Sequence, residues 1–585
     1  MLPNWLEKRY RNLLESHLDS AFRFEDAVKV LKEKMKDSEE QVNVILSELR
    51  KRGYLEVRFD PEDSRKRIYR LKNSEEIITE TLSLKKNQLT RGDLESLLKG
   101  AADLIRTRVE YTFILVLLFY KRISDKWELE FETAYKEALE DGLKEEEAMQ
   151  EAKNSIYHDF DISEELLWGN IRKDPARLPE NFSKAMKILA ERNPELKDVF
   201  ENVDFVQFTT NRENAEILRQ LVELFSEKSL NHVSPDILGD AYEWILKYFA
   251  PQKAKEGEVY TAREVIKLMV EILDPKPGEW VYDPACGSGG MLIVSYKHVE
   301  AEHGKREVEK LFLFGQEANH KTLALAKMNL YIHDIRNAQL MLGDTLLYPK
   351  FKAEEGVKRF DIVIANPPWN QDGYDEEILK KGEFWRERFR HGFTPRQSAD
   401  WAWIQHMVSS AKGDTGRVGI VIDNGCLFRG GKEKAIRTGI VNADLIESVI
   451  LLPEKLFYNT GAPGAMIILN KNKSKERKGK VFFINASREY QQHPEVRKLN
   501  QLGEDHIEKI VGAYREFRDE DGFSRAVEIE KIKENDYNLN VTLYVFPEEE
   551  TEEIDVAKEW EELRAIEKEI LVIEEKIEGY LTELK

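Results

Sequence analysis

The sequence predicts an α/β fold in which helices cover both faces of a doubly wound sheet. From Pro251 onward, short apolar segments of strand length alternate with helical segments, a pattern typical of parallel pairing. Polar motifs directly follow several of these segments, and open α/β sheets bind their ligands at the carboxyl ends of strands. The segments expected to be strands are VYDPA, LFLFGQE, QLMLGD, FDIVIAN, GRVGIVID, LIESVILL and GAMIILN.

Length and composition are those of a globular protein with ample core. The chain has 585 residues, enough for three or four domains. Its longest apolar run, YTFILVLLFY from Tyr111, is about half as long as a bilayer requires, so we expect a buried helix. The N-terminus has no signal-peptide pattern, and only Cys286 and Cys426 occur, which favours a reducing cytoplasm. We expect a cytoplasmic protein with no membrane contact.

The net charge of −20 argues against a large nucleic-acid groove lined by this chain alone. The charge is uneven, because residues 1–72 carry 17 Lys and Arg against 14 Asp and Glu, or +3, which leaves −23 for the rest. A surface that contacts DNA would therefore be local or shared with a partner.

Residues 1–75 are expected to form a winged helix-like module. Two amphipathic stretches, EDAVKVLKEKM and SEEQVNVILSELRKRG, predict helices, and YLEVRFDPEDSRKRIYRL predicts two strands joined by a polar turn. Helix, helix and basic hairpin together outline a winged helix. Such modules contact DNA or another protein, and the sequence favours neither.

Three further regions follow along the chain. Residues 89–250 are mainly helical with acidic, solvated faces, residues 251–545 hold the alternating pattern, and residues 546–585 predict an acidic C-terminal helix. Apolar residues of that last helix step by three and four, the spacing of a coiled-coil seam: Leu563, Ile566, Ile570, Ile573, Ile577, Tyr580 and Leu584. Burial of this seam within the chain and docking on a partner are both open.

Acidic residues end three successive predicted strands. The first strand leads into DPACGSGG, which runs from Asp283 to Gly290 and whose glycines allow a tight turn close to a ligand. An acid beside such a turn suits a cationic or amino-bearing ligand better than a pyrophosphate. The second strand ends at Glu317, the position of a carboxylate that accepts from ribose hydroxyls, and the third reaches Asp344, which could meet an adenine edge. Upstream, Thr261 is expected to cap a helix, with Glu264 completing a capping box.

The fourth strand ends in Asn-Pro-Pro-Trp, residues 366–369. One proline would suffice to stop a strand, and the tryptophan has no obvious core to fill. An amide carbonyl and a backbone carbonyl fixed by two prolines can accept both hydrogens of an exocyclic amino group. A flat indole can stack on a base extruded from a duplex. The motif could therefore hold and orient the amino group of an extruded nucleobase.

The chain resembles the modification (M) subunit of type I restriction–modification systems, an S-adenosylmethionine-dependent N6-adenine DNA methyltransferase. Matching stretches run from about Leu89 to the C-terminus, whereas residues 1–75 lie outside the resemblance. They are KYFAPQKAKEGEVYTAREVIKLMVEIL, YDPACGSGGMLI, GQEANHKTLALAKMNLYIH, GDTL, NPPW, NGCLFRGG, LPEKLFYNTGAPGAMIILNK and FFINAS.

The resemblance implies a Rossmann-like class I methyltransferase core with a doubly wound mixed sheet, S-adenosyl-L-methionine as cofactor and no metal. It assigns catalysis to Asn366, Pro367, Pro368 and Trp369. It assigns cofactor binding to Glu258, Val259, Tyr260, Thr261, Ala262, Arg263, Asp283, Ala285, Gly287, Ser288, Gly289, Gly290, Glu317 and Asp344. The implied partners are double-stranded DNA and a specificity (S) subunit, with two M chains per S chain. Whether a restriction (R) subunit joins them is open.

Some features depart from the family or leave alternatives. Trp369 stands where the family usually has Phe or Tyr, which keeps a stacking face in a pocket of different shape. Only about fifty residues separate this motif from the next strand, too few for a target-recognition domain. GCLFRGGKE narrowly misses a phosphate-binding loop, so an ATPase motor is not expected. The alternatives are a protein-glutamine or RNA amino-methyltransferase and a non-catalytic winged-helix DNA-binding regulator.

Overall fold

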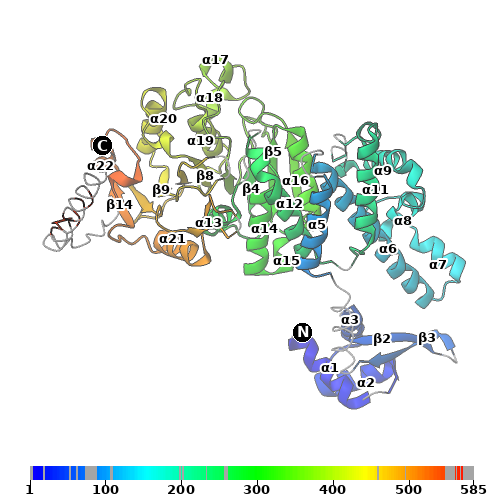
Figure 1. Ribbon diagram of the computed structural model, residues 1–585. Coiled ribbons are helices and arrows are strands. Elements are labelled where there is room, and N and C mark those ends of the chain that lie inside the picture. The colour runs from blue at the N-terminus through cyan, green and yellow to red at the C-terminus, as the bar shows by residue number, and fades with distance from the viewer. Residues whose placement is uncertain are drawn as a thin grey trace.

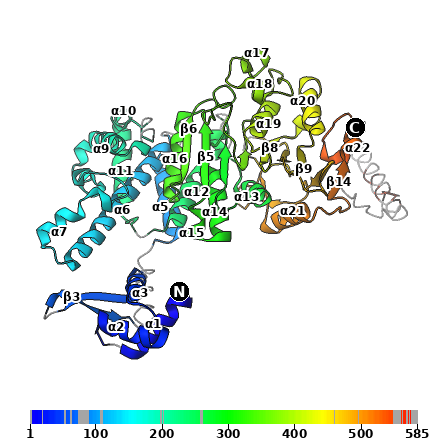
Figure 2. The ribbon, with the colours of Figure 1, turned by 180° about the vertical axis from the view of Figure 1, so that it is seen from behind.

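The computed structural model describes residues 4–17, 20–51, 54–60, 63–72, 89–105, 110–196, 199–200, 203–231, 233–255, 261–457, 460–494, 496–546 and individual positions between 560 and 573. Figures 1 and 2 show a helical domain beside a large sheet and the N-terminal module below the helical domain. Among the described residues, no helix is long and apolar enough to cross a membrane.

The N-terminal module has its own small core. Its elements are α1 (Asn4–His17), β1 (Phe22–Arg23), α2 (Phe24–Met35), α3 (Glu39–Lys51), β2 (Leu55–Asp60) and β3 (Asp63–Leu71). The strands pair antiparallel in the order β1-β3-β2, and side chains from α1, α2, α3 and the strands fill the space between them. This order of helices and strands is that of a winged helix. The sequence predicted α2, α3, β2 and β3 of this module but not helix α1 or the two-residue strand β1.

The helical domain packs around the apolar run that begins at Tyr111. That run lies in α6 (Thr112–Glu140), where residues 114–120 are all buried. The other helices of the domain are α5 (Arg91–Ile105), α7 (Glu145–Ala152), α8 (Trp168–Ile171), α9 (Leu178–Arg192), α10 (Phe205–Phe208), α11 (Arg212–Ser226) and α12 (Pro235–Lys255). Their core extends to α16 (His320–Ile332), so the helical domain packs directly against the sheet domain.

In the described part of the chain, the main sheet has nine strands in the order β14-β11-β9-β10-β8-β7-β4-β5-β6. The expected strands are β4 (Trp280–Asp283), β5 (Phe312–Glu317), β6 (Ala338–Leu342), β7 (Ile362–Ala365), β8 (Arg417–Asp423), β9 (Ile446–Leu451) and β10 (Gly464–Asn470). Two strands not expected from the sequence, β11 (Lys480–Asn485) and β14 (Ser524–Glu528), extend one edge. Strand β10 runs antiparallel to β8 and β9, and β14 to β11, so the predicted doubly wound mixed sheet is confirmed.

Helices cover both faces of this sheet. The core on one face includes residues of α13 (Arg263–Leu273), α14 (Gly290–His303) and α21 (Glu504–Glu516). The core on the other includes residues of α19 (Asp400–Ser409), α20 (Gly431–Asn442) and α22 (Ile529–Glu534). Shorter helices are α15 (Lys305–Val308), α17 (Glu376–Leu379) and α18 (Trp385–Arg388), and β12 (Gln491–Gln492) pairs with β13 (Asn500–Gln501).

The strand order of the sheet has a switch point at β4, because the strands that follow it in sequence lie first on one side of it and then on the other. From β4 the chain proceeds through β5 to β6 at one edge and then returns to β7, which pairs with the other side of β4. A crevice at such a switch point is the usual ligand site of an open α/β sheet. The predicted cofactor loop and the Asn-Pro-Pro-Trp motif follow β4 and β7, on the two sides of this crevice.

Candidate active site

The loop after β4 forms a tight turn that only glycine adopts readily. Gly287 has φ of 53° and Gly289 has φ of 83°, both in the left-handed region. A Cβ added at Gly287 would meet nothing within 4 Å, so its missing side chain leaves open space beside the backbone. The amide of Asn329 donates to the carbonyl of Ser288 (3.0 Å) and holds the turn from α16.

Two carboxylates support this turn. Asp283 is buried, and its Oδ1 accepts from the backbone N–H of Ala285 at 3.0 Å. Burial raises the pKa of Asp283 to about 8; the charge of Glu317 acts in the same direction and the bond from Ala285 opposes it. Glu317 accepts from the N–H groups of Gly287 (3.0 Å) and Asn319 (2.8 Å). The two strand-end acids therefore meet at one turn.

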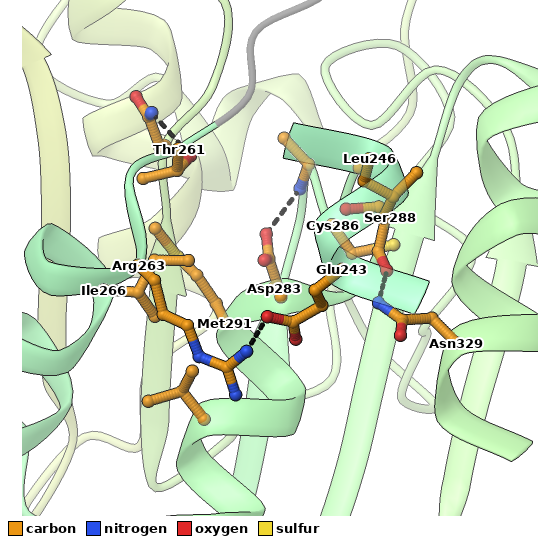
Figure 3. Close-up of a pocket in the computed structure, with 15 residues that line it drawn as sticks. Glu243, Leu246, Thr261, Arg263, Ile266, Asp283, Cys286, Ser288, Met291 and Asn329 are labelled. Carbon is orange, nitrogen blue, oxygen red and sulfur yellow. Dashed lines mark hydrogen bonds and ion pairs between the residues drawn. The ribbon is translucent and has the colours of Figure 1, made fainter. Parts of the chain in front are cut away.

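A pocket opens over this turn, and residues of helix α12 and of the sheet region line it. Figure 3 shows Asp283 between Thr261 on one side and Cys286, Ser288 and Asn329 on the other. The lining residues are Glu243, Leu246, Thr261, Arg263, Ile266, Asp283, Ala285, Cys286, Gly287, Ser288, Gly290, Met291, Val294, Asn329 and Asn366. Glu243 and Leu246 come from α12, and Glu243 forms an ion pair with Arg263. The sequence had not indicated these two, because α12 has the pattern of an ordinary packed helix.

The expected capping box at Thr261 is wrong. Helix α13 begins at Arg263, its N-cap residue is Ala262, and no side chain caps it. The Thr261 hydroxyl accepts instead from the side-chain Nδ2 of Asn366 at 2.8 Å, a tertiary contact that a local rule cannot anticipate. Glu264 is also displaced from a capping role, and burial raises the pKa of its carboxyl. Residues 258–260 of the predicted site lie outside the described residues.

Asn366 links the pocket to the Asn-Pro-Pro-Trp turn. It follows the fully buried strand β7, and only 9% of its surface is exposed. The indole Nε1 of Trp369 donates to Asn366 Oδ1 at 2.8 Å. An indole nitrogen can only donate, so the amide carbonyl faces Trp369 and the amide nitrogen faces Thr261. Trp369 also has a packing partner, the ring of Phe457, 4.8 Å away between centroids.

A charge cluster that includes the buried carboxylates of Asp400 and Glu433 fixes the end of this turn. Asn370 has φ of 51°, its N–H donates to Asp400 Oδ1 (2.9 Å), and its side chain accepts from Arg429 (2.6 Å). The same guanidinium binds Asp400, Asp423 and Glu433. Burial raises the pKa of Asp400 to about 6. Arg429 belongs to the segment that resembled a phosphate-binding loop, and in the structure it holds the residue that follows the Asn-Pro-Pro-Trp turn.

Asp344 lies apart from the pocket-lining residues. Its Oδ2 accepts from the Tyr374 hydroxyl (2.8 Å) and its Oδ1 from the N–H of Leu347 (3.1 Å). These contacts orient the carboxylate at the end of β6. The adenine contact expected of Asp344 stays a prediction.

Comparison with known proteins defines the class. A family model for N-6 DNA methylases matches residues 233–553, and one for the HsdM N-terminal domain matches residues 94–225. Together with the sheet and its Asn-Pro-Pro-Trp turn, the first match defines an adenine-specific DNA methyltransferase. The chain belongs to the methylase (M) subunits of type I restriction–modification systems.

Alignments with three relatives span between about two thirds and all of this chain. The chain is 46% identical to the type I restriction enzyme MjaVIII methylase subunit of Methanocaldococcus jannaschii, over 100% of this chain and 98% of that one. It is 31% identical to the HindI methylase subunit of Haemophilus influenzae, over 69% of this chain and 90% of that one. A solved methyltransferase subunit of a Streptococcus thermophilus type I system has a TM-score of 0.68 at 28% identity, covering 78% of this chain and all of that one.

These findings confirm the main functional prediction and give no support to the protein, RNA or regulator alternatives. The MjaVIII relative aligns over the whole chain, residues 1–75 included, whereas the two family models begin at residues 94 and 233.

The indole at position 369 allows a direct test of base stacking. We expect Trp369→Ala to reduce methyl transfer by roughly 5- to 150-fold, because base–aromatic stacking contributes about 1–3 kcal/mol. Trp369→Phe keeps a flat ring and should lose much less. The measurement is transfer of labelled methyl groups to target DNA, with Tyr157→Ala, a remote exposed aromatic, as control. Equal losses in the Ala and Phe variants would mean that position 369 does not stack on the base.

Proposed function

We propose that the glycine turn, Asp283 and Glu317 hold S-adenosyl-L-methionine and that Asn366 and Pro367 hold the target adenine. The residues fit this cofactor: an acid-lined pocket suits its ammonium and sulfonium groups, and the open space at Gly287 admits a close ligand. The carboxylate of Glu317 is suited to ribose hydroxyls. We further propose the domain limits 1–75, 89–250, 251–545 and 546–585.

The bound cofactor supplies an electrophilic methyl group, and the chain supplies the geometry. The lone pair of adenine N6 is delocalised into the ring, which makes the amine a weak nucleophile. The side-chain carbonyl of Asn366 and the backbone carbonyl of Pro367 accept its two hydrogens and favour a pyramidal nitrogen whose lone pair points at the methyl group. Pro368 fixes the turn, and Trp369 stacks on the extruded base. Positioning of the two reactants accounts for most of the rate.

One observation carries this proposal: Asn366 and Asp283 line the same pocket. Because Trp369 donates to Asn366 in the structure without DNA, the base must share or displace that bond when it enters. The substitutions Asp283→Ala and Asn366→Ala test the two halves of the site separately, since the first removes a cofactor contact and the second a base contact.

We also propose the partners. Relatives named as methylase subunits of restriction enzymes support double-stranded DNA as substrate and a specificity subunit that selects the target sequence, with two M chains per S chain. A restriction subunit is a further candidate partner. The two cysteines are buried thiols, which agrees with a cytoplasmic location.

The C-terminal seam is the proposed contact with the specificity subunit. Leu563, Ile566, Ile570 and Ile573 are 49–56% exposed, although they are large and apolar. The other seam residues, at 577, 580 and 584, lie outside the described residues. An isolated helix with such a stripe is marginal in water, so a partner that covers it would stabilise both.

Truncation after Pro547, or Ile570→Asp combined with Ile573→Asp, should leave cofactor binding intact. Both changes should abolish co-purification with the specificity subunit and methylation of the target site, because a charged seam cannot be buried. Lys568→Asp changes charge on the same helix outside the seam and should have little effect. If the truncated chain still assembles and methylates normally, the seam is intrachain packing and this proposal is wrong.

A further inference from the structure

The winged helix folds around its own core, and its net charge is opposite in sign to that of the rest of the chain. Its core residues all fall between Leu6 and Leu71, so the module does not depend on the core of the helical domain. Residues 1–72 carry a net charge of +3 within a chain of −20. Phosphate attracts positive charge regardless of base sequence, so this module is better suited to a duplex than the remainder of the chain is.

The exposed face of α3 carries side chains that can contact base edges. In helix-turn-helix proteins the second helix enters the major groove, and α3 has that place here. Val42, Ile45, Leu46 and Leu49 of α3 face the core. Asn43 and Ser47 are exposed on the opposite face, and the apolar Val44 beside them is 57% exposed. Amide and hydroxyl groups bond to base edges, and a small apolar side chain can contact a thymine methyl group.

Two cations of the module contact carboxylates of the helical domain. Arg50, near the end of α3, donates to Glu140 at 2.6 Å, and Arg67, in β3, donates to Asp141 at 3.2 Å. Glu140 ends α6 and Asp141 follows it, so both lie at the negative end of a 29-residue helix dipole. The four side chains are 37–58% exposed. Ion pairs this exposed are weak and weaken further in salt.

We propose that the winged helix is a second DNA-binding surface of this subunit, and that Glu140 and Asp141 compete with DNA phosphates for Arg50 and Arg67. The proposal rests on DNA as the substrate but not on the catalytic assignments. The recognition helix and the hairpin present these two arginines as a winged helix presents cations to a DNA backbone, and two carboxylates at a helix end imitate adjacent phosphates. Contacts of this kind would bind a segment of the duplex that does not include the methylated base.

The test is binding of a labelled duplex of arbitrary sequence to the full chain, followed by fluorescence anisotropy at several salt concentrations. Arg50→Gln combined with Arg67→Gln should weaken binding roughly tenfold at low salt and reduce the salt slope by about two, or about 0.9 per lost phosphate contact. Glu140→Gln combined with Asp141→Asn should strengthen binding, because the competing carboxylates are gone. Arg172→Gln breaks an equally exposed ion pair with Glu223 elsewhere in the helical domain and should change neither quantity.

The outcomes separate this proposal from the methyltransferase mechanism. Cofactor affinity, measured by calorimetry, should be unchanged in all of these variants, since none lies near the pocket. Unchanged DNA affinity and salt slope in the Arg50 and Arg67 double variant would overturn the proposal. So would a chain lacking residues 1–72 that binds DNA normally yet no longer co-purifies with the specificity subunit, because the module would then contact protein.

Discussion

Replacing Asn366 with alanine is expected to abolish methyl transfer while leaving S-adenosylmethionine binding intact. The amide carbonyl is needed when the adenine nitrogen becomes pyramidal, so its loss affects the transition state far more than the bound cofactor. Removing one oriented polar group from a transition state lowers the rate by about 10²–10³-fold in other enzymes, and we expect at least that here. The measurements are single-turnover transfer of labelled methyl groups and cofactor calorimetry.

Asn366→Asp is the matched variant for this experiment. It keeps an acceptor oxygen but loses the Nδ2 that donates to Thr261, so it should retain more activity than the alanine variant. Digestion of labelled product DNA should yield N6-methyladenine, and N4-methylcytosine alone would refute the base assignment. A parallel loss of cofactor affinity in Asn366→Ala would show that the residue belongs to the cofactor site instead.

Asp283→Ala and Glu317→Ala should each abolish or greatly weaken cofactor binding without unfolding the protein. Both carboxylates lie at the glycine turn, and Asp283 also lines the pocket. Asp283→Asn provides the control, since it can still accept from Ala285 but cannot become negative. Calorimetry measures affinity, and circular dichroism with thermal unfolding verifies the fold. Undiminished affinity in both alanine variants would overturn the cofactor assignment.

The raised pKa of Asp283 makes this binding depend on pH. With a pKa of about 8, the free protein holds the carboxyl protonated at neutral pH, whereas a cationic ligand favours the carboxylate. Binding must then release a proton, so affinity should rise with pH, by at most about tenfold per unit, and level off near pH 8. The free energy of unfolding of the cofactor-free protein should fall as the pH rises from about 4 to about 8. Over this range the unfolded chain has ionised Asp283, whereas the folded chain still holds it protonated. Asp283→Asn should remove both dependences.

The part of the site that sequence predicts well lies at strand ends. Asp283 and Glu317 end β4 and β5, and Asn366 follows β7, because apolar strands and their terminal polar residues share one local pattern. Parallel pairing then brings those ends to one edge of the sheet. The position of these motifs at one edge of the sheet therefore follows from local sequence patterns alone.

Contacts between distant segments could not be predicted in this way. Thr261 satisfied every local rule for a helix cap, yet its hydroxyl bonds to Asn366, more than one hundred residues later. Glu243 reaches the pocket from helix α12, some forty residues before the glycine turn in the sequence. Arg429 supports the Asn-Pro-Pro-Trp turn only because β8 and α19 bring Asp423 and Asp400 to it. Such partners depend on packing, which no short window of sequence contains.

The place of β7 beside β4 affects how the enzyme folds. Residues 281–282 pair with residues 362–363, so the crevice between Asp283 and Asn366 cannot form until the chain beyond β7 has left the ribosome. Parallel pairing over that separation is slow, because the intervening loop must close first. Until then the edge of β4 is open to other strands, a hazard for aggregation. Since all four residues of β7 are buried, its insertion closes the cores on both faces and brings Asn366 to the pocket in the same step.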